Sequence, residues 1–213
     1  MEDKNRWYNF TFRITWPNNQ EPRVWIDIFL ADTLVRNAIE LGQKKTPITL
    51  WRIHRRWPRD ERGHEFSLDC YTTDEIASLI DNFFKNSKEH KMLHENNLLE
   101  EYHYNVDGEN IEDITTDAWP SEAAGKTWLL NGKKAWPYYI KGCCEMFLHL
   151  IEVIKDDRDS GNDIGQIERF YQEIDKRLTE IWQGYGCHAF FHHLSAVFGH
   201  KPLHLQGQFW GRF

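Results

Sequence analysis

The feature that most constrains the fold is a strict two-residue repeat of large apolar side chains near the amino terminus. Between residues 8 and 16 every second side chain is aromatic or aliphatic, and polar side chains occupy the positions between them. The apolar set is Tyr8, Phe10, Phe12, Ile14 and Trp16. Because successive side chains of a strand point to opposite faces, this repeat predicts a strand with one buried face.

A helix and a hairpin are expected after this strand. In residues 25–39 the apolar side chains recur at helical spacing, and Gly42 follows at a position where helices commonly end. Strand-like alternation returns in residues 48–57 and 66–71. The turn residues of 58–63 separate these two runs, so we expect an antiparallel hairpin.

A second helix and a fourth strand complete the first half. Thr72 and Glu75 have the spacing of a capping box, and a helical apolar stripe follows in residues 76–84. Residues 98–106 can supply the fourth strand. The order strand, helix, strand, strand, helix, strand is the ferredoxin-like split arrangement. We therefore predict an α+β fold with a ferredoxin-like domain and an antiparallel sheet in residues 1–106.

The second half has helical periodicity. Residues 107–126 are acidic and rich in turn residues, which favours a linker. A helix over 137–154, with its proline in the first turn, is apolar nearly all round and is expected to be buried on most sides. An amphipathic helix over 164–181 and a short last helix over 187–198 follow. We predict that the helical region, residues 127–213, packs on the first domain.

Charge and composition narrow the classes of function. The 213 residues carry a formal net charge of −7, which disfavours general binding to nucleic acids or anionic membranes. No apolar run approaches the roughly 20 residues of a membrane span, and the amino terminus lacks the apolar core of a signal peptide. We expect a cytoplasmic protein. The adjacent Cys143 and Cys144 suit reduced thiols in a helix.

Five of the eleven histidines gather near the carboxyl terminus. His188 and His192 have the spacing that places two imidazoles on one helix face, and His193 follows directly. No carboxylate lies between Gly184 and Phe213, so the glutamate of an H-E-x-x-H site is missing. We expect these side chains to pack or to contact another subunit, and a metal site is the alternative. His90 and His94 share the same spacing, for which solvation at an exposed helix end is expected.

The sequence contains no motif of a stand-alone enzyme. A G-x-S-x-G elbow and a glycine-rich phosphate loop are both missing. Binding of RNA to a ferredoxin-like sheet needs exposed aromatic side chains, whereas those of the first strand belong to the inward set.

The hairpin carries the most distinctive cluster of charge. Arg52 and Arg56 can lie across from Glu65 and Asp69, either as a ladder of surface pairs or as a contact site for another chain. We treat one set of side chains of this region as candidates for binding a peptide or a partner. They are Trp51, Arg52, His54, Arg55, Arg56, Trp57 and Tyr71.

Two segments resemble a known family. The hairpin sequence WRIHRRWPRDERGHEFSLDCYTT and the helix opening AWPYYIKGCCEMFLHLIE are similar to the MbnC family, the small partner subunit of methanobactin biosynthesis. The resemblance implies a partner of the MbnB type, an iron-containing subunit of TIM-barrel fold. It also implies that the pair oxidises cysteines of a short precursor peptide to oxazolone and thioamide groups that later bind copper. The irons would belong to the partner, and this chain would hold no cofactor and help to bind the peptide leader.

A recognition subunit is compatible with a fold that lacks catalytic motifs, because an unpaired sheet edge accepts a peptide as an extra strand. In the usual ferredoxin-like order the second and fourth strands are the edges, so the basic strand over 48–57 is a candidate docking edge. Three alternatives stay open. They are a stand-alone metalloenzyme using the carboxyl-terminal histidines, a peptide-modifying domain of the lanthipeptide or thiopeptide type, and a nucleic-acid binder.

Overall fold

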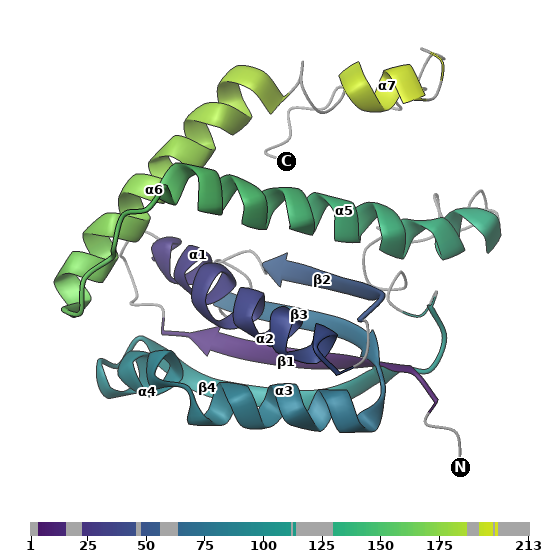
Figure 1. Cartoon of the computed structure of the whole chain (residues 1–213), viewed down its shortest axis with the longest axis horizontal. Coiled ribbons are helices and arrows are strands. Elements are labelled where there is room, and N and C mark those ends of the chain that lie inside the picture. Colours follow the sequence, from purple (N-terminus) through teal and green to yellow (C-terminus); the bar gives the residue numbers. More distant parts are fainter. Residues whose placement is uncertain are drawn as a thin grey trace. The chain divides into compact units, whose positions relative to one another are not determined.

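Figure 1 shows a computed structural model of the chain. It describes residues 4–15, 23–45, 48–55, 64–111, 113, 130–186, 192–197 and 199. Contacts along the chain divide it into two compact units, Met1–Asp175 and Lys176–Phe213. The boundary between the units falls inside a helix.

The first unit is built on a four-stranded antiparallel sheet. The strands lie side by side in the order β2-β3-β1-β4, and each pairs antiparallel with its neighbours. Their bounds are β1 (Arg6–Ile14), β2 (Leu50–Arg55), β3 (His64–Thr72) and β4 (Leu99–Gly108). The α+β class is therefore confirmed, and β2 and β4 are the edges that the split arrangement requires.

The register of the strands explains the apolar repeat. Phe10 lies opposite Leu68 of β3 and Tyr104 of β4, so these side chains share one face of the sheet. Phe10 and Phe12 are fully buried there, and both rings contact the ring of Phe84 edge-on. Each such side chain contributes about 1.5–3 kcal/mol through burial, so this face forms the core.

Helices cover the apolar face of the sheet (Figure 1). The first helical stretch is continuous along the chain and contains a π-helical segment. Its parts are α1 (Trp25–Leu30), η1 (Ala31–Val35) and α2 (Arg36–Gln43), and the second stretch comprises α3 (Asp74–Asn86) and α4 (Lys88–Glu95).

Two local predictions for the second helical stretch were wrong. The α3 cap is Thr73, whose hydroxyl accepts from the Ile76 amide, so Thr72 and Glu75 form no capping box. His90 is half-buried rather than solvated, because its ring packs against Phe12 and Tyr102.

The second half contains α5 (Leu130–Lys155), α6 (Ile164–Tyr185) and the short α7 (His193–Val197). Pro137 lies inside α5 and not in its first turn, which corrects the predicted start of that helix. Among the described elements, the helix packs against β2 and η1 (Figure 1). Tyr138, Tyr139 and Val153 are exposed, so the expectation of burial on most sides was also wrong.

Parts of the sequence-based prediction fall outside the described residues. These are most of the expected linker, from 114 to 126, and the start of the expected last helix, 187–191. Within the described ranges, no helix is both long enough and apolar enough to cross a membrane.

Candidate polypeptide-binding edges of the sheet

The outer edge of β2 is closed by α5. The backbone N–H of Ile53 donates to Sγ of Cys144 at 3.2 Å, and the Cys144 thiol donates to the Ile53 carbonyl at 3.8 Å. Burial raises the pKa of Cys144 to about 11, so the group stays a thiol and keeps its proton for this contact. Nearby, Trp136 and Pro137 of α5 line one small depression together with Trp51. A strand added at Ile53 would have to displace α5.

The same contact fixes which backbone groups face outward on β4. Ile53 directs its N–H and C=O away from β3, so it exchanges no backbone hydrogen bonds with Leu68, the residue opposite it. The N–H and C=O of Leu68 therefore point toward β1, on the other side of β3. Leu68 therefore exchanges hydrogen bonds with Phe10, and Phe10 directs no backbone group toward β4. Tyr104, opposite Phe10, must then direct its N–H and C=O toward the outer edge.

Tyr102 and Val106 share this orientation with Tyr104, because outward and inward residues alternate along a regular ladder. Within the part of the chain that the structure describes, no strand pairs with this edge. The side chains of Glu100, Glu101 and Asp107 are exposed on β4, and the Val106 side chain is 53% exposed. Charged side chains are a common protection of a free edge against unselective pairing.

Arg52 lies on the opposite face of the sheet from Phe10 and binds a buried carboxylate. It pairs with Asp69 across the β2–β3 ladder, with Nε 2.6 Å from Oδ2 of Asp69. Asn9 donates to the other oxygen of Asp69 at 2.5 Å. Arg52 thus lies across from Asp69, one of the two acidic residues expected opposite the arginines, but Asp69 is fully buried, so the expected surface position of this pair was wrong. Glu65 pairs with Arg13 at 3.2 Å.

Arg55 binds a second buried carboxylate that the sequence analysis missed. Its Nε lies 2.7 Å from Oδ2 of Asp27, and His64 Nε2 lies 2.7 Å from the other oxygen. Asp27 and His64 are both buried. Burial also raises the pKa of the neighbouring Asp175. The positive charge of Arg55 acts in the other direction and lowers the pKa of Asp175. A signal for this cluster was present, since Asp27 is the one charged residue within the apolar run WIDIFL.

The other predicted binding residues are dispersed. Trp51 is buried, Tyr71 is half-buried against Trp7, and His54 is exposed. Arg56 and Trp57 lie outside the described residues. A role of these side chains toward an incoming chain stays a prediction.

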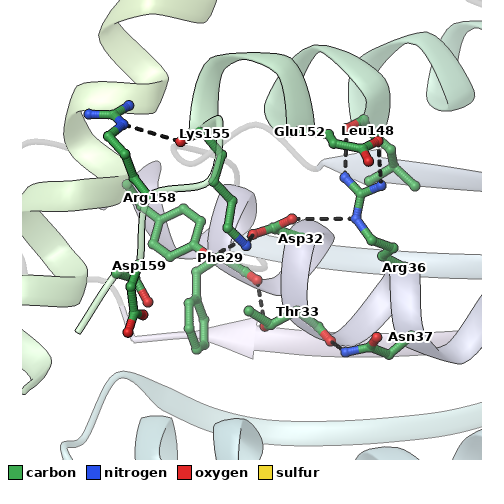
Figure 2. Close-up of polar contacts among 12 residues, drawn as sticks. Phe29, Asp32, Thr33, Arg36, Asn37, Leu148, Glu152, Lys155, Arg158 and Asp159 are labelled. Carbon is green, nitrogen blue, oxygen red and sulfur yellow. Dashed lines mark hydrogen bonds and ion pairs between the residues drawn. The ribbon is translucent and has the colours of Figure 1, made fainter. Parts of the chain in front are cut away.

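A third buried carboxylate ties α5 and α6 to the helices on the sheet (Figure 2). Asp32, in the π-helical segment η1, accepts from Lys155 Nζ at 2.8 Å and from the hydroxyl of Tyr171 at 2.8 Å. Arg36 Nε lies 3.4 Å from the same carboxylate and also donates to the Leu148 carbonyl. Burial and the charge of Asp32 raise the pKa of Tyr171 well above its usual range, so its hydroxyl remains a donor.

The described ranges include His192 and His193 of the histidines considered as metal ligands. His192 and His193 are exposed, and His188 lies outside those ranges. Among the described residues, no three His, Cys, Asp or Glu side chains are placed to hold a metal ion.

Comparisons of the chain with protein-family models, with curated proteins and with solved structures find no match.

Proposed function

We propose that this chain is a recognition subunit that binds a polypeptide as an additional strand along the outer edge of β4. Following the resemblance of its hairpin and α5, we place it in a peptide-modifying complex of the methanobactin type. An iron-bearing partner of the MbnB type would carry out the oxidation, and this chain would hold the leader of the precursor peptide.

The observation that carries the proposal is the orientation of the β4 backbone. The N–H and C=O groups of Tyr102, Tyr104 and Val106 are directed away from β1, at an edge with no described neighbour. Backbone groups of this kind provide hydrogen bonds that tolerate many sequences, whereas pockets beside the strand provide selectivity. The β2 edge is a weaker candidate, since Cys144 already binds the backbone of Ile53 there.

The charge of β4 indicates what kind of segment it would accept. Glu100 and Glu101 are exposed beside the edge. Arg13 lies 3.8 Å from Glu101, whereas Glu100 forms no ion pair with another described residue. Opposite charges directly across strands stabilise pairing and like charges oppose it. We therefore expect the bound segment to carry lysine or arginine where it faces Glu100, and few acidic residues.

Proline at position 106 tests the proposal most cleanly. Val106→Pro removes an outward amide and leaves the β1–β4 ladder intact, because edge strands tolerate proline where the N–H faces outward. We expect the variant to bind a cysteine-containing precursor peptide with a basic leader about tenfold more weakly in calorimetric titration, since one backbone hydrogen bond is lost. Modification of the peptide by the reconstituted complex should slow in parallel.

The matched control is Val106→Ala, which changes the side chain and keeps the amide. It should bind the peptide nearly as the parent does, and both variants should melt like the parent. Equal affinity of the parent and of folded Val106→Pro would show that the peptide does not add to this edge.

A further inference from the structure

The outward side of α5 is apolar over its whole described length. Seven residues fall within an arc of about 100° on a helical projection and define the outer α5 face. They are Ala135, Tyr138, Tyr139, Gly142, Met146, His149 and Val153. All seven are exposed, and His149 is the one basic residue among them. Contiguous exposed apolar surface of this kind marks an interaction site.

Gly142 supports the same conclusion independently. It lies in the interior of a long helix, where glycine lowers helix stability relative to alanine. A Cβ added at this position would meet nothing within 4 Å, so the fold of the single chain does not require glycine. Glycine is useful where another backbone or side chain must approach the helix closely.

We propose that the outer α5 face binds the same face of a second copy, with the two α5 helices antiparallel about a two-fold axis. A register that places Gly142 opposite Met146 of the second copy also places Ala135 opposite Val153. In each of these two pairs a small residue of one helix faces a larger residue of the other. The remaining layer pairs Tyr139 with His149, a ring against a ring.

The charges beside this face are complementary in the same register. Lys134 and Lys141 lie on one flank toward the start of α5, and Glu145 and Glu152 lie on that flank toward its end. Antiparallel packing brings Lys141 near Glu145 of the second copy and Lys134 near Glu152. The two copies of Glu145 approach the axis. Each lies beside Lys141 of its own chain and near Lys141 of the other copy. An isologous interface needs this kind of self-complementarity, which is why we choose a second copy as the occupant.

Sedimentation equilibrium of the full chain over a range of concentrations tests the proposal. The parent should form a dimer, and Met146→Glu should raise the dissociation constant by at least about tenfold, since the two-fold axis introduces the charge twice into an apolar contact. Asn82→Glu adds the same charge on the exposed side of α3 and should leave the constant unchanged.

Gly142→Ala separates the interface from the stability of the helix. It should raise the melting temperature of the monomer, because alanine favours the helix, and yet weaken the dimer, because Met146 of the second copy loses its space. The proposal is overturned if the parent stays monomeric up to about 1 mM. It is also overturned if Met146→Glu dimerises as tightly as the parent, or if α5 binds only a different protein.

Discussion

Three buried carboxylates connect elements that lie far apart in the chain. Asp27 binds Arg55 and His64, Asp32 binds Lys155, and Asp69 binds Arg52. Removing one partner of a buried ion pair is strongly destabilising because the remaining charge loses its compensation. These contacts therefore place Arg52 and Arg55 in the framework of the fold.

Arg52→Ala is expected to destabilise the chain. The Asp69 side chain is 1% exposed, so its charge would stay buried and lose its guanidinium partner. We expect a loss of about 3–5 kcal/mol in the free energy of unfolding, measured with denaturant. Lys45→Ala is the control, because the exposed pair of Lys45 with Glu75 should contribute less than about 1 kcal/mol.

Unchanged stability of Arg52→Ala together with weaker peptide binding would assign Arg52 to peptide binding. If the free energy of unfolding of Arg52→Ala stayed near that of the parent and its affinity for the precursor peptide fell, the guanidinium would serve the incoming chain. The framework role predicts the reverse pattern, with lower stability and an unchanged affinity in the fraction that remains folded.

The protonation of His90 should make the folded chain less stable at acidic pH. Burial, with smaller contributions from the charges of His94 and Lys91, lowers the pKa of His90 below its usual 6.5. The folded state then binds fewer protons than the unfolded state, so stability falls as the pH drops from 6.5 toward the lowered pKa. His90→Gln should reduce this loss, measured as the free energy of unfolding between pH 7.5 and about 5.

Asn82→Gln is the control, because Asn82 is exposed on α3 and neither side chain titrates. Its free energy of unfolding should follow nearly the same course with pH as that of the parent. Identical pH profiles for the parent and His90→Gln would show that protonation of His90 does not oppose folding.

At the scale of elements, the π-helical segment η1 is the connection between the helices on the sheet and the long helices of the second half. It presents Asp32 to α5 and α6 (Figure 2). Tyr171 of α6 is 1% exposed and also packs its ring edge-on against Phe29. The hydroxyl of Tyr171 is thus one of several contacts that position α6.

Tyr171→Phe isolates the hydroxyl contact. The ring packing on Phe29 is retained while Asp32 loses a donor at 2.8 Å. Hydrogen bonds to charged groups contribute about 1.5–3 kcal/mol, and we expect a loss of stability in this range by denaturant unfolding. Tyr185→Phe removes an exposed hydroxyl and should change nothing. A loss below about 0.5 kcal/mol for Tyr171→Phe would mean that Lys155 and Arg36 satisfy Asp32 alone.

Helices and strands were predictable where the apolar residues of a segment recurred with a single regular spacing. The repeat in β1 and the helical spacing after Trp25 each identified their element, because periodicity reports which side of an element is buried. The failures were local or depended on other elements. Thr73 and not Thr72 caps α3, a one-residue choice that the pattern cannot resolve. Apolar side chains also occupy the exposed side of α5, so the composition of this helix suggested that it is buried on most sides.

At the scale of the whole molecule, the strand order followed from the sequence of elements, but the state of each edge did not. The contact that closes the β2 edge joins Ile53 to Cys144, which are 91 residues apart. The partner of Arg55 is Asp27, on a helix that local periodicity described only as apolar. The lone charge of Asp27 in the run WIDIFL indicates a buried carboxylate, but one sequence does not show which distant segment supplies its partner, so the basic hairpin suggested a docking surface.

We propose that β4, and not β2, is the edge of the sheet that receives a polypeptide. Amide hydrogen exchange with single-residue resolution, without and with the precursor peptide, tests it directly. The amides of Tyr104 and Val106 should exchange rapidly in the free chain and become protected on binding, whereas the amide of Ile53 should be protected in both states. Unchanged exchange at Tyr104 and Val106 in a saturated complex, with new protection along β2, would contradict it.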